Sequence, residues 1–380
     1  MESHKQPHLK IEKEKAQKFI KYIKKNFKGL SILTNKFKTI KQEDFILFPL
    51  NNELPDYEKV KDQLNAHLNC EIINTKAIAN SDYKPRSLEK ALDKKIPQNL
   101  MKFIPKSFDI IGDIAIVELN QFDNIERTDN IKELIAQAII TVNKNIKTVY
   151  EKISEIEGTL RLRDLEHLAG KNRTETIHKE NNCKFKLDVK KTFFSPRLNY
   201  ERQRVSHSNI KTGEKIVDMF SGVGPFSIQI AKINVVKIYA FDINPIAIKY
   251  LQENINMNKL QGVISPFNKN IRTLLNPTNS LANSLKHNID RIIMNLPKTS
   301  LSFMDVVSYL SKKEGTTIHN YQICSKPESI RKAIKNLEEK FGSFELKLEG
   351  IKHARIVKSY SPKEDMISID AFIKNTLSDY

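Results

Sequence analysis

Short apolar runs alternate with amphipathic stretches along the second half of the chain, from about residue 215 onward. The apolar runs predict buried strands, and apolar residues spaced three or four positions apart predict helices. The expected elements are strand 215–220, helix 225–233, strand 237–242, helix 245–257, strand 263–267, strand 290–295, helix 301–311, strand 316–321, helix 326–341 and strands near 344–351 and 366–373. This alternation predicts a mostly parallel, doubly wound α/β sheet, and the two final strands predict an antiparallel edge hairpin.

The first half of the chain has a less regular pattern, which predicts smaller α+β domains. The expected units are a basic amphipathic helix at 1–27, a small α/β module with a polar linker at 28–96, a middle basic α+β domain at 97–192 and the doubly wound α/β domain at 193–380. Strands are expected at 45–50 and 114–119. Within the last domain, we expect the polar stretch 276–288 to be a surface loop.

The chain is strongly basic, with 63 Lys and Arg against 45 Asp and Glu, a formal net charge of +18 and a pI near 9.5. Such an excess favours a polyanionic partner, because each neutralised phosphate releases condensed counterions. A genome rich in Lys, Ile and Asn codons would produce the same excess, so charge leaves both explanations open. The role of the basic helix is also undecided, since its residues can contact RNA or its apolar stripe can pack on the next domain.

The cysteines and the hydropathy pattern exclude other classes of protein. Cys70, Cys183 and Cys324 have neither metal-ligand spacing nor a disulfide pattern, so we expect a reduced, cytoplasmic protein without a bound metal. No run approaches the ~18 apolar residues of a membrane span, and the N-terminus lacks the apolar core of a signal peptide. We expect no membrane partner.

Loops with glycine and acidic residues follow successive predicted strands, at the sheet edge where ligands bind. Gly222 and Gly224 let the backbone pass close to a ligand, and the following helix offers free N–H groups to a carboxylate. Asp242 ends the next strand, where an acid accepts both hydroxyls of a ribose. This arrangement differs from the dinucleotide fingerprint and suits a methionine carboxylate better than a pyrophosphate. It predicts S-adenosyl-L-methionine as the cofactor.

Other residues around these loops complete the predicted cofactor site. Asn270, or alternatively Asn268, follows the third strand, where its oxygen can accept a bond from the adenine amino group. The alternative reading is that all of these are ordinary turn residues of an α/β sheet. The full set of predicted cofactor-binding residues is Asp218, Phe220, Gly222, Gly224, Phe226, Asp242, Ile243, Asn270 and Asn295.

Asn295-Leu296-Pro297 follows the fourth strand of the predicted sheet. Methyltransferases that act on amino groups commonly carry N/D-P-P-Y/F there, with an aromatic that stacks on the base. Leu296 replaces the first proline, and no aromatic follows at once. The motif therefore argues against methylation of an exocyclic amine.

With these motifs the chain resembles the archaeal and eukaryotic tRNA (guanine 37-N1)-methyltransferases. The resemblance rests on residues 161–170, 173–181, 194–202, 218–226 and 294–297, in order, and covers the chain from about Phe103 onward. The first third is similar, more loosely, to the small domain that holds the outer corner of tRNA. The resemblance implies a monomeric enzyme with a Rossmann-like class I methyltransferase domain, which binds the anticodon stem-loop and the outer corner of tRNA.

The same resemblance implies the catalytic residues. Guanine N1 must lose a proton as it gains the methyl group, so the site needs a base and a donor to O6. By similarity, Glu201 is the base and Arg161 is the O6 donor, with Arg163 expected on the same side of a strand. Asn295 and Pro297 are expected to hold the guanine edge. The alternative for Glu201 is a surface glutamate paired with a neighbouring arginine.

Further residues are expected to bind the RNA. Phe193 is expected to stack on the flipped base, although a core role fits equally well. Arg197, Arg202 and Arg204 are expected to contact phosphates of the anticodon stem, with a generic ion-pair face as the alternative. The predicted substrate-binding residues are Phe193, Arg163, Arg197 and Arg202.

The rival functions are enzymes of the wyosine pathway that act on the same nucleotide, and a non-catalytic RNA-binding protein. The wyosine rivals are a bifunctional methyltransferase and an aminocarboxypropyl transferase, in which the resemblance implies E-x-N-P after the second strand. Asp242-Ile243-Asn244-Pro245 and the retained Asn295 favour methyl transfer. Intact Asp218, Asp242, Asn295 and Glu201 argue against a protein without activity.

Overall fold

A computed structural model describes residues 5–28, 30–52, 57–68, 70–123, 128–154 and 158–376. The chain divides into two compact units, Met1–Asp93 and Lys94–Tyr380. The finer division into four parts remains a prediction.

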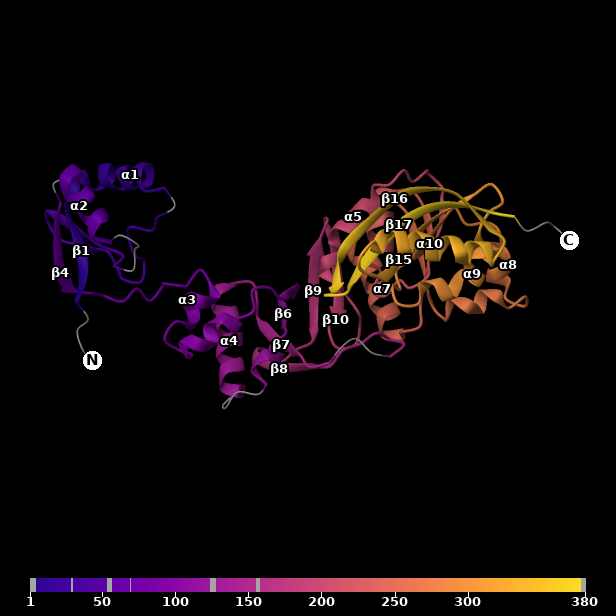
Figure 1. The fold of residues 1–380 in the computed structure, drawn as a ribbon, viewed down its shortest axis with the longest axis horizontal. Helices are drawn as coiled ribbons and strands as arrows, with labels where there is room; N and C mark the ends of the chain where they lie inside the picture. The colour runs from indigo at the N-terminus through magenta and orange to yellow at the C-terminus, as the bar shows by residue number, and fades with distance from the viewer. Residues whose placement is uncertain are drawn as a thin grey trace. The chain divides into compact units, whose positions relative to one another are not determined.

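The first unit is a small antiparallel sheet with helices packed on it (Figure 1). The strand order is β2-β3-β1-β4, and Leu9, Phe19, Phe48 and Leu64 lie in its core. Its elements are β1 (Lys5–Glu12), α1 (Ala16–Asn26), β2 (Ile40–Lys41), β3 (Phe45–Pro49), α2 (Tyr57–Leu68), β4 (Glu71–Lys76) and α3 (Leu88–Leu92). The strand predicted at 45–50 is confirmed.

The predicted helix at 1–27 is wrong for its first half. Residues 5–12 form strand β1, which pairs with both β3 and β4, and residues 1–4 lie outside the described residues. Leu9 and Ile11 are buried on a strand period, whereas Ala16 and Phe19 are the buried residues of the helix that follows. Lysines along the whole segment obscured this change of period, because they occupy the exposed positions of both elements.

The second unit begins with a middle segment that contains its own small sheet, in the order β5-β6-β7-β8, and the separate hairpin of β9 and β10. Its elements are β5 (Asp109–Ile111), β6 (Ile114–Val117), α4 (Thr128–Val142), β7 (Thr148–Lys152), β8 (Leu165–Gly170), β9 (Glu175–Glu180) and β10 (Cys183–Asp188). The strand expected at 114–119 is present, and it ends at Val117.

The large sheet of the second unit has the order β13-β12-β11-β14-β15-β17-β16. The strands from β13 to β15 are parallel, and β17 is antiparallel to both β15 and β16, so the predicted sheet and its edge hairpin are confirmed. The strands are β11 (Lys215–Asp218), β12 (Lys237–Asp242), β13 (Val263–Asn268), β14 (Arg291–Met294), β15 (Thr316–Ser325), β16 (Leu346–Ser361) and β17 (Glu364–Asn375).

Helices cover both faces of this sheet (Figure 1). Residues of α5 (Asn199–Ser206), α6 (Pro225–Ile233) and α7 (Pro245–Met257) pack into the core on one face. Residues of α8 (Ser280–Leu285), α9 (Met304–Leu310) and α10 (Ser329–Gly342) pack into the core on the other. Within the described ranges, no helix is both long and apolar enough to cross a membrane.

The stretch 276–288, predicted as a surface loop, contains helix α8 instead. The Asn279 side chain caps this helix by accepting the backbone N–H of Leu281 at 3.1 Å. Ala282 and Leu285 are fully buried in the core beneath it. The many Asn and Ser residues indicated a loop, although one of the asparagines is a helix cap and the buried residues are three positions apart.

Candidate active site

A cavity of about 550 Å³ lies at the carboxyl edge of the large sheet. Loops after β11, β12, β13 and β14 form part of its wall, and residues 158–161 and 193–195 of the preceding segment complete it. Among the predicted site residues, this main cavity is lined by Arg161, Phe193, Arg202, Phe220, Gly222, Phe226, Asp242, Ile243, Asn270 and Asn295. The remaining predicted residues, which do not line it, are Arg163, Arg197, Glu201, Asp218, Gly224 and Pro297.

Asp242 joins two of the loops that form the wall. Its carboxylate accepts the backbone N–H of Gly222 at 2.7 Å and that of Asn244 at 2.8 Å. Burial raises the pKa of Asp242, although these N–H groups oppose the shift. Each carboxylate oxygen keeps a further lone pair. The side chain can therefore hold the Gly222 loop in place and still accept hydrogen bonds from a ligand in the main cavity.

The predicted glycines have different surroundings. Gly222 lines the main cavity with a φ of 54°, and a Cβ there would meet only the carbonyl oxygen of Phe193, at 3.8 Å. Gly224 is the N-cap of α6 with a φ of 89°, and a Cβ would lie 2.3 Å from Leu251 Cδ1. Gly222 therefore faces the ligand space. Gly224 allows a left-handed turn and close packing of α6 against α7.

Asp218 does not reach the main cavity, although it was predicted to bind the cofactor. It is 1% exposed, and its Oδ2 accepts the Ser227 hydroxyl at 2.7 Å. Its Oδ1 has no hydrogen-bond partner among the described residues. Burial raises the pKa of Asp218 to about 7, in spite of the bond from Ser227. The carboxylate points inward from the end of β11 and braces the start of α6.

The adenine side of the predicted site has both apolar and amide groups. Phe220, Ile243 and Ile271 line this part of the main cavity, and the Phe220 ring contacts Phe303 edge-on with centroids 4.9 Å apart. Asn270 also lines it, and its side-chain oxygen accepts the Arg272 backbone N–H at 3.0 Å. That bond fixes the amide. Asn268, the alternative, is exposed and donates to the carbonyl of Asp242 instead.

Arg161 lies in a turn and not on a strand, since β8 begins only at Leu165. Its φ of 55° is left-handed, and its guanidinium carbon lies 5.2 Å from the centroid of the Phe193 ring. Burial lowers the pKa of Arg161, and nearby Tyr360 opposes the shift. The guanidinium forms no ion pair with any described residue. Its donors are thus available to a ligand in the main cavity.

The premise that Arg161 and Arg163 project from one strand is therefore wrong. Arg163 also precedes β8, and it does not line the main cavity. Both arginines line a smaller neighbouring cavity, together with Phe193 and Phe194. Arg161 is the arginine of this pair that the fold brings to the cofactor loops.

The Asn295-Leu296-Pro297 loop turns away from the sheet after β14. Asn295 and Leu296 line the main cavity, whereas Pro297 does not. The Pro297 carbonyl accepts the backbone N–H of Ile323 at 3.2 Å, and the Leu296 carbonyl accepts that of Ser300 at 2.8 Å. Pro297 therefore shapes the loop, and Asn295 is the polar residue of the motif that lines the cavity.

Glu201 is 1% exposed, which excludes the alternative of a surface glutamate. Its Oε2 accepts bonds from Nη2 and Nε of Arg204, at 2.9 and 3.1 Å, and from the Tyr321 hydroxyl at 3.3 Å. Tyr321 also packs against Phe226, with ring centroids 5.7 Å apart, and Phe226 lines the main cavity. Glu201 therefore lies one layer of side chains behind the cavity wall.

The structure argues against Arg202 as a contact for RNA phosphates. Its guanidinium is 1% exposed and pairs with both carboxylate oxygens of Glu180, at 2.5 and 2.7 Å. It also donates to the Ser195 carbonyl. Arg204 is likewise engaged, with Glu201 and Asp370. Arg197 differs, because it is 52% exposed and pairs with Asp109 at the surface.

Some residues that line the main cavity were not predicted. Lys269 and Lys298 bring positive charge to its wall, and Phe303 packs against both Phe220 and Arg272. Lys298 directly follows the Asn295-Leu296-Pro297 motif, so its position was available from the sequence. Phe303 was not, because only the return of the chain through the 3₁₀ turn Ser300–Phe303 brings it back to the β11 loop.

Comparisons with known proteins agree with this geometry. Residues 176–349 match the model of the TRM5/TYW2 methyltransferase domain, and residues 88–174 match that of the TYW2 N-terminal domain. The tRNA (guanine(37)-N(1))-methyltransferase Trm5b of Pyrococcus abyssi is 37% identical over 342 residues, which are 90% of this chain and 92% of the relative. The corresponding enzyme of Methanocaldococcus jannaschii is 34% identical, over 95% of this chain and 97% of the relative.

A solved structure described as the complex of aTrm5 and tRNALeu is also similar. It is 34% identical, the match covers 97% of this chain and 99% of that chain, and the TM-score is 0.73. The sheet order and the cavity at the carboxyl ends of β11, β12 and β14 fit a methyltransferase domain of this kind. The sequence match to the Pyrococcus abyssi enzyme also extends over nearly the full length of both chains. The chain therefore belongs to the family of tRNA (guanine(37)-N(1))-methyltransferases that carry the TRM5/TYW2 methyltransferase domain.

Proposed function

We propose that this protein transfers a methyl group from S-adenosyl-L-methionine to N1 of guanine 37 in tRNA. The observation that carries the proposal is the composition of the main cavity. Asp242 and Asn295 reach it from strand ends of the methyltransferase domain, and Arg161 reaches it from the segment before β8. A methyl donor bound to Asp242 and a guanine held between Asn295 and Arg161 would thus lie in the same cavity.

The side chains of the main cavity fit S-adenosyl-L-methionine. The Asp242 carboxylate has lone pairs left for ribose hydroxyls after accepting its backbone bonds. Phe220, Ile243 and Ile271 offer apolar contact to a purine, and Gly222 leaves room for close approach. When bound, this donor supplies an electrophilic methyl group on a sulfonium. The residues of the chain orient the target nitrogen for in-line attack.

The guanine edge is assigned to Asn295 and Arg161. Arg161 donates to O6, where negative charge grows as N1 loses its proton, and Asn295 holds the polar edge of the base. Arg161 lines the main cavity, and no described carboxylate pairs with it, so its donors are available to a substrate base. This supports the role. Phe193 supports Arg161 through the stacking contact.

Glu201 is the proposed base. It takes the N1 proton while the bond from N1 to the methyl carbon forms and the bond from that carbon to sulfur breaks. The products are 1-methylguanosine and S-adenosylhomocysteine, and the proton later passes to water. Because Glu201 lies behind the cavity wall, the flipped guanine must displace part of that wall to reach it.

The RNA partner is proposed from charge and from the relatives. The net charge of +18 suits a polyanion, and exposed Arg197 lies in the segment that supplies Phe193 and Ser195 to the cavity wall. The compact unit Met1–Asp93 would hold the outer corner of tRNA. The monomeric state stays a prediction from the resemblance.

The test uses transcripts of one tRNA with guanine, adenine or inosine at position 37, incubated with the methyl donor. Digestion and mass spectrometry should identify 1-methylguanosine at position 37 of the guanine transcript. Methylation of the adenine transcript at position 37 would contradict the proposal. Transfer of a 3-amino-3-carboxypropyl group would identify the wyosine alternative, and methylation of a wyosine precursor as well would identify a bifunctional enzyme.

The role of Glu201 needs a separate test. Glu201→Gln keeps the shape of the side chain and removes its basicity, so the rate of methyl transfer in a single turnover should fall by about 100-fold or more. Calorimetry should show normal affinity for the methyl donor. An unchanged rate would reject Glu201 as the base and leave the assigned substrate untouched.

A further inference from the structure

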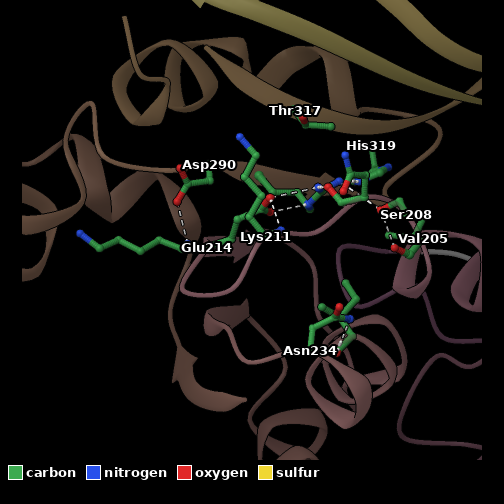
Figure 2. Close-up of polar contacts among 12 residues, drawn as sticks. Val205, Ser208, Lys211, Glu214, Asn234, Asp290, Thr317 and His319 are labelled. Atoms are coloured by element: carbon green, nitrogen blue, oxygen red, sulfur yellow. Dashed lines mark hydrogen bonds and ion pairs between the residues drawn. The ribbon is translucent and has the colours of Figure 1, made fainter. Parts of the chain in front are cut away.

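A row of charged and polar side chains crosses the interior of the methyltransferase domain, and it begins at Glu201. We call it the buried charge chain, and its members in order are Glu201, Arg204, Asp370, His319, Arg291 and Glu214. Glu201, Asp370, His319 and Arg291 are each at most 5% exposed. Figure 2 shows the far end of the buried charge chain, with Glu214 beside Lys211 and His319 beside Ser208.

The far half of the buried charge chain has a fixed hydrogen-bond direction. Arg291 Nε donates to Glu214 at 3.0 Å, and Arg291 Nη1 lies 2.7 Å from His319 Nε2. Arginine can only donate, so Nε2 accepts and His319 is neutral. His319 Nδ1–H then donates to Asp370 Oδ1 at 2.7 Å. Burial lowers the pKa of His319, Asp370 opposes this, and Arg291 adds to it.

The near half holds a charged pair next to the proposed base. Arg204 donates to both carboxylate oxygens of Asp370 and to Oε2 of Glu201. Burial favours the protonated form of Asp370, but His319 and Arg204 outweigh it and hold the pKa of Asp370 below its ordinary value. Asp370 therefore stays ionised and fixes Arg204. Replacing a buried pair of this kind by apolar groups is often neutral for stability, so stability gives no reason to retain it.

The two carboxylate oxygens of Glu201 differ in the hydrogen bonds that they accept. Oε2 accepts from Arg204 and from Tyr321, whereas Oε1 forms no hydrogen bond with any described residue although it is fully buried. A buried carboxylate oxygen without a donor is costly, so such an atom requires a reason. Arg355 Nη1 forms only a long ion pair with Oε1, at 3.6 Å. Arg355 is 36% exposed and stacks on Tyr200, so it can move aside when a substrate nitrogen approaches.

We propose that Arg204, anchored by Asp370, is a positioning residue that holds Glu201 by Oε2 and leaves Oε1 as the atom that accepts the proton. The inference rests on the proposed function. It also explains the course of the buried charge chain, because Arg291 begins β14 and Asn295 directly follows that strand. The buried charge chain thereby connects helix α5, which carries Glu201, to strand β14, which Asn295 follows.

The test compares single-turnover methylation of the guanine transcript by the full-length protein. Arg204→Gln should slow transfer by at least about ten-fold, because misplacing a reacting group by about 1 Å costs up to about 100-fold. Arg204→Lys should restore part of the rate by keeping the charge. Affinity for the methyl donor and for tRNA should be unchanged, so the loss falls on kcat and not on KM.

The double variant Arg204→Gln with Asp370→Asn guards against failure to fold, since it leaves no unpaired buried charge in this pair. It should stay as slow as Arg204→Gln. Recovery of the wild-type rate would overturn the inference, because the pair would then only compensate charge. Glu214→Gln is the matched control at the far end of the buried charge chain, and it should lower stability without changing the rate.

The rate of Arg204→Gln decides the inference. A wild-type rate in this variant would overturn it, because Glu201 would then be held correctly without Arg204. Failure of the proposed function would appear elsewhere: the wild-type protein would not form 1-methylguanosine, or Glu201→Gln would keep the wild-type rate.

Discussion

The guanidinium of Arg161 lies over the ring of Phe193, with the guanidinium carbon 5.2 Å from the ring centroid. The arginine therefore occupies a face of the ring that was expected to stack on the flipped guanine. Both side chains line the main cavity, and the left-handed turn at Arg161 directs the guanidinium onto the ring. Phe193 thus orients the proposed O6 donor, and a guanine can use this ring face only if Arg161 moves.

This contact predicts the effect of Phe193→Leu. A cation–π contact contributes about 0.5–2 kcal/mol, so its loss should slow single-turnover methyl transfer by about two- to thirty-fold. Phe193→Tyr keeps the ring and should keep the rate. Affinity for the methyl donor should be the same in both variants. Equal rates for Leu and Phe at this position would mean that Arg161 is oriented without the ring.

The glycines after β11 should respond differently to alanine. Gly224→Ala places a Cβ 2.3 Å from Leu251 at a φ of 89°. Left-handed strain of roughly 1–2 kcal/mol and overpacking of roughly 1–3 kcal/mol should together lower the free energy of unfolding by about 2–5 kcal/mol. Urea denaturation measures this loss. Gly222→Ala should cost only the strain, since its Cβ would have no close contact.

Binding of the methyl donor should reverse this order. Gly222 lines the main cavity and Gly224 does not, so calorimetry should show weaker binding for Gly222→Ala than for folded Gly224→Ala. Gly342→Ala is the control, because this glycine has no atom within 4 Å of the added Cβ. It should leave stability and binding near the wild-type values. Equal stability losses at Gly222 and Gly224 would contradict the packing argument.

Local sequence signals were sufficient for the regular part of the fold. The predicted bounds of α6 and α7 match the structure, because a proline begins each helix and the apolar spacing continues to its end. The hairpin of β16 and β17 was predicted, but its strands are much longer than expected. β16 contains bulges against β17, and these shift its inward positions and interrupt the alternation that indicates a strand.

The cofactor side of the site could be predicted because parallel strands must bring their carboxyl ends to one edge. The direction in which each side chain points could not be predicted from the sequence. Asp218 turns inward to Ser227, and Arg202 pairs with Glu180, which lies in the preceding β9 strand. Such partners are set by tertiary packing and not by local spacing. For this reason the loops lie at the predicted edge of the sheet, while Asp218 and Arg202 make contacts that the spacing did not indicate.

Removing one partner of the buried pair of Arg202 and Glu180 should destabilise the protein strongly, because the other partner is left buried without its counter-charge. Glu180→Gln leaves the guanidinium of Arg202 buried without a counter-charge, which should cost about 3–5 kcal/mol of unfolding free energy. Glu339→Gln is a matched control, since Glu339 forms an exposed pair with Lys335 and should change stability by less than about 0.5 kcal/mol. A loss for Glu180→Gln no larger than the control would show that the bidentate pair is absent in solution.

The pH dependence of this pair has a definite sign. Burial opposes ionisation of Glu180, but His178 and Arg202 outweigh it and lower its pKa below the ordinary value of 4.5. A lowered folded-state pKa gives stability that is present above 4.5 and is lost as pH falls further. Wild-type protein should therefore lose unfolding free energy as the solution is acidified below pH 4.5, and Glu180→Gln should lose less.

Asp218 should produce a pH effect of the opposite sign, because burial raises its pKa from 3.8 to about 7. A raised folded-state pKa gives stability that is fully present below pH 3.8 and is lost as pH rises through 7. Asp218→Asn cannot ionise, and its amide oxygen can still accept the Ser227 hydroxyl. The difference in unfolding free energy between wild type and Asp218→Asn should therefore shift in favour of the variant from pH 5 to pH 8. Urea denaturation across that range measures it, and a constant difference would place the Asp218 carboxyl in contact with water.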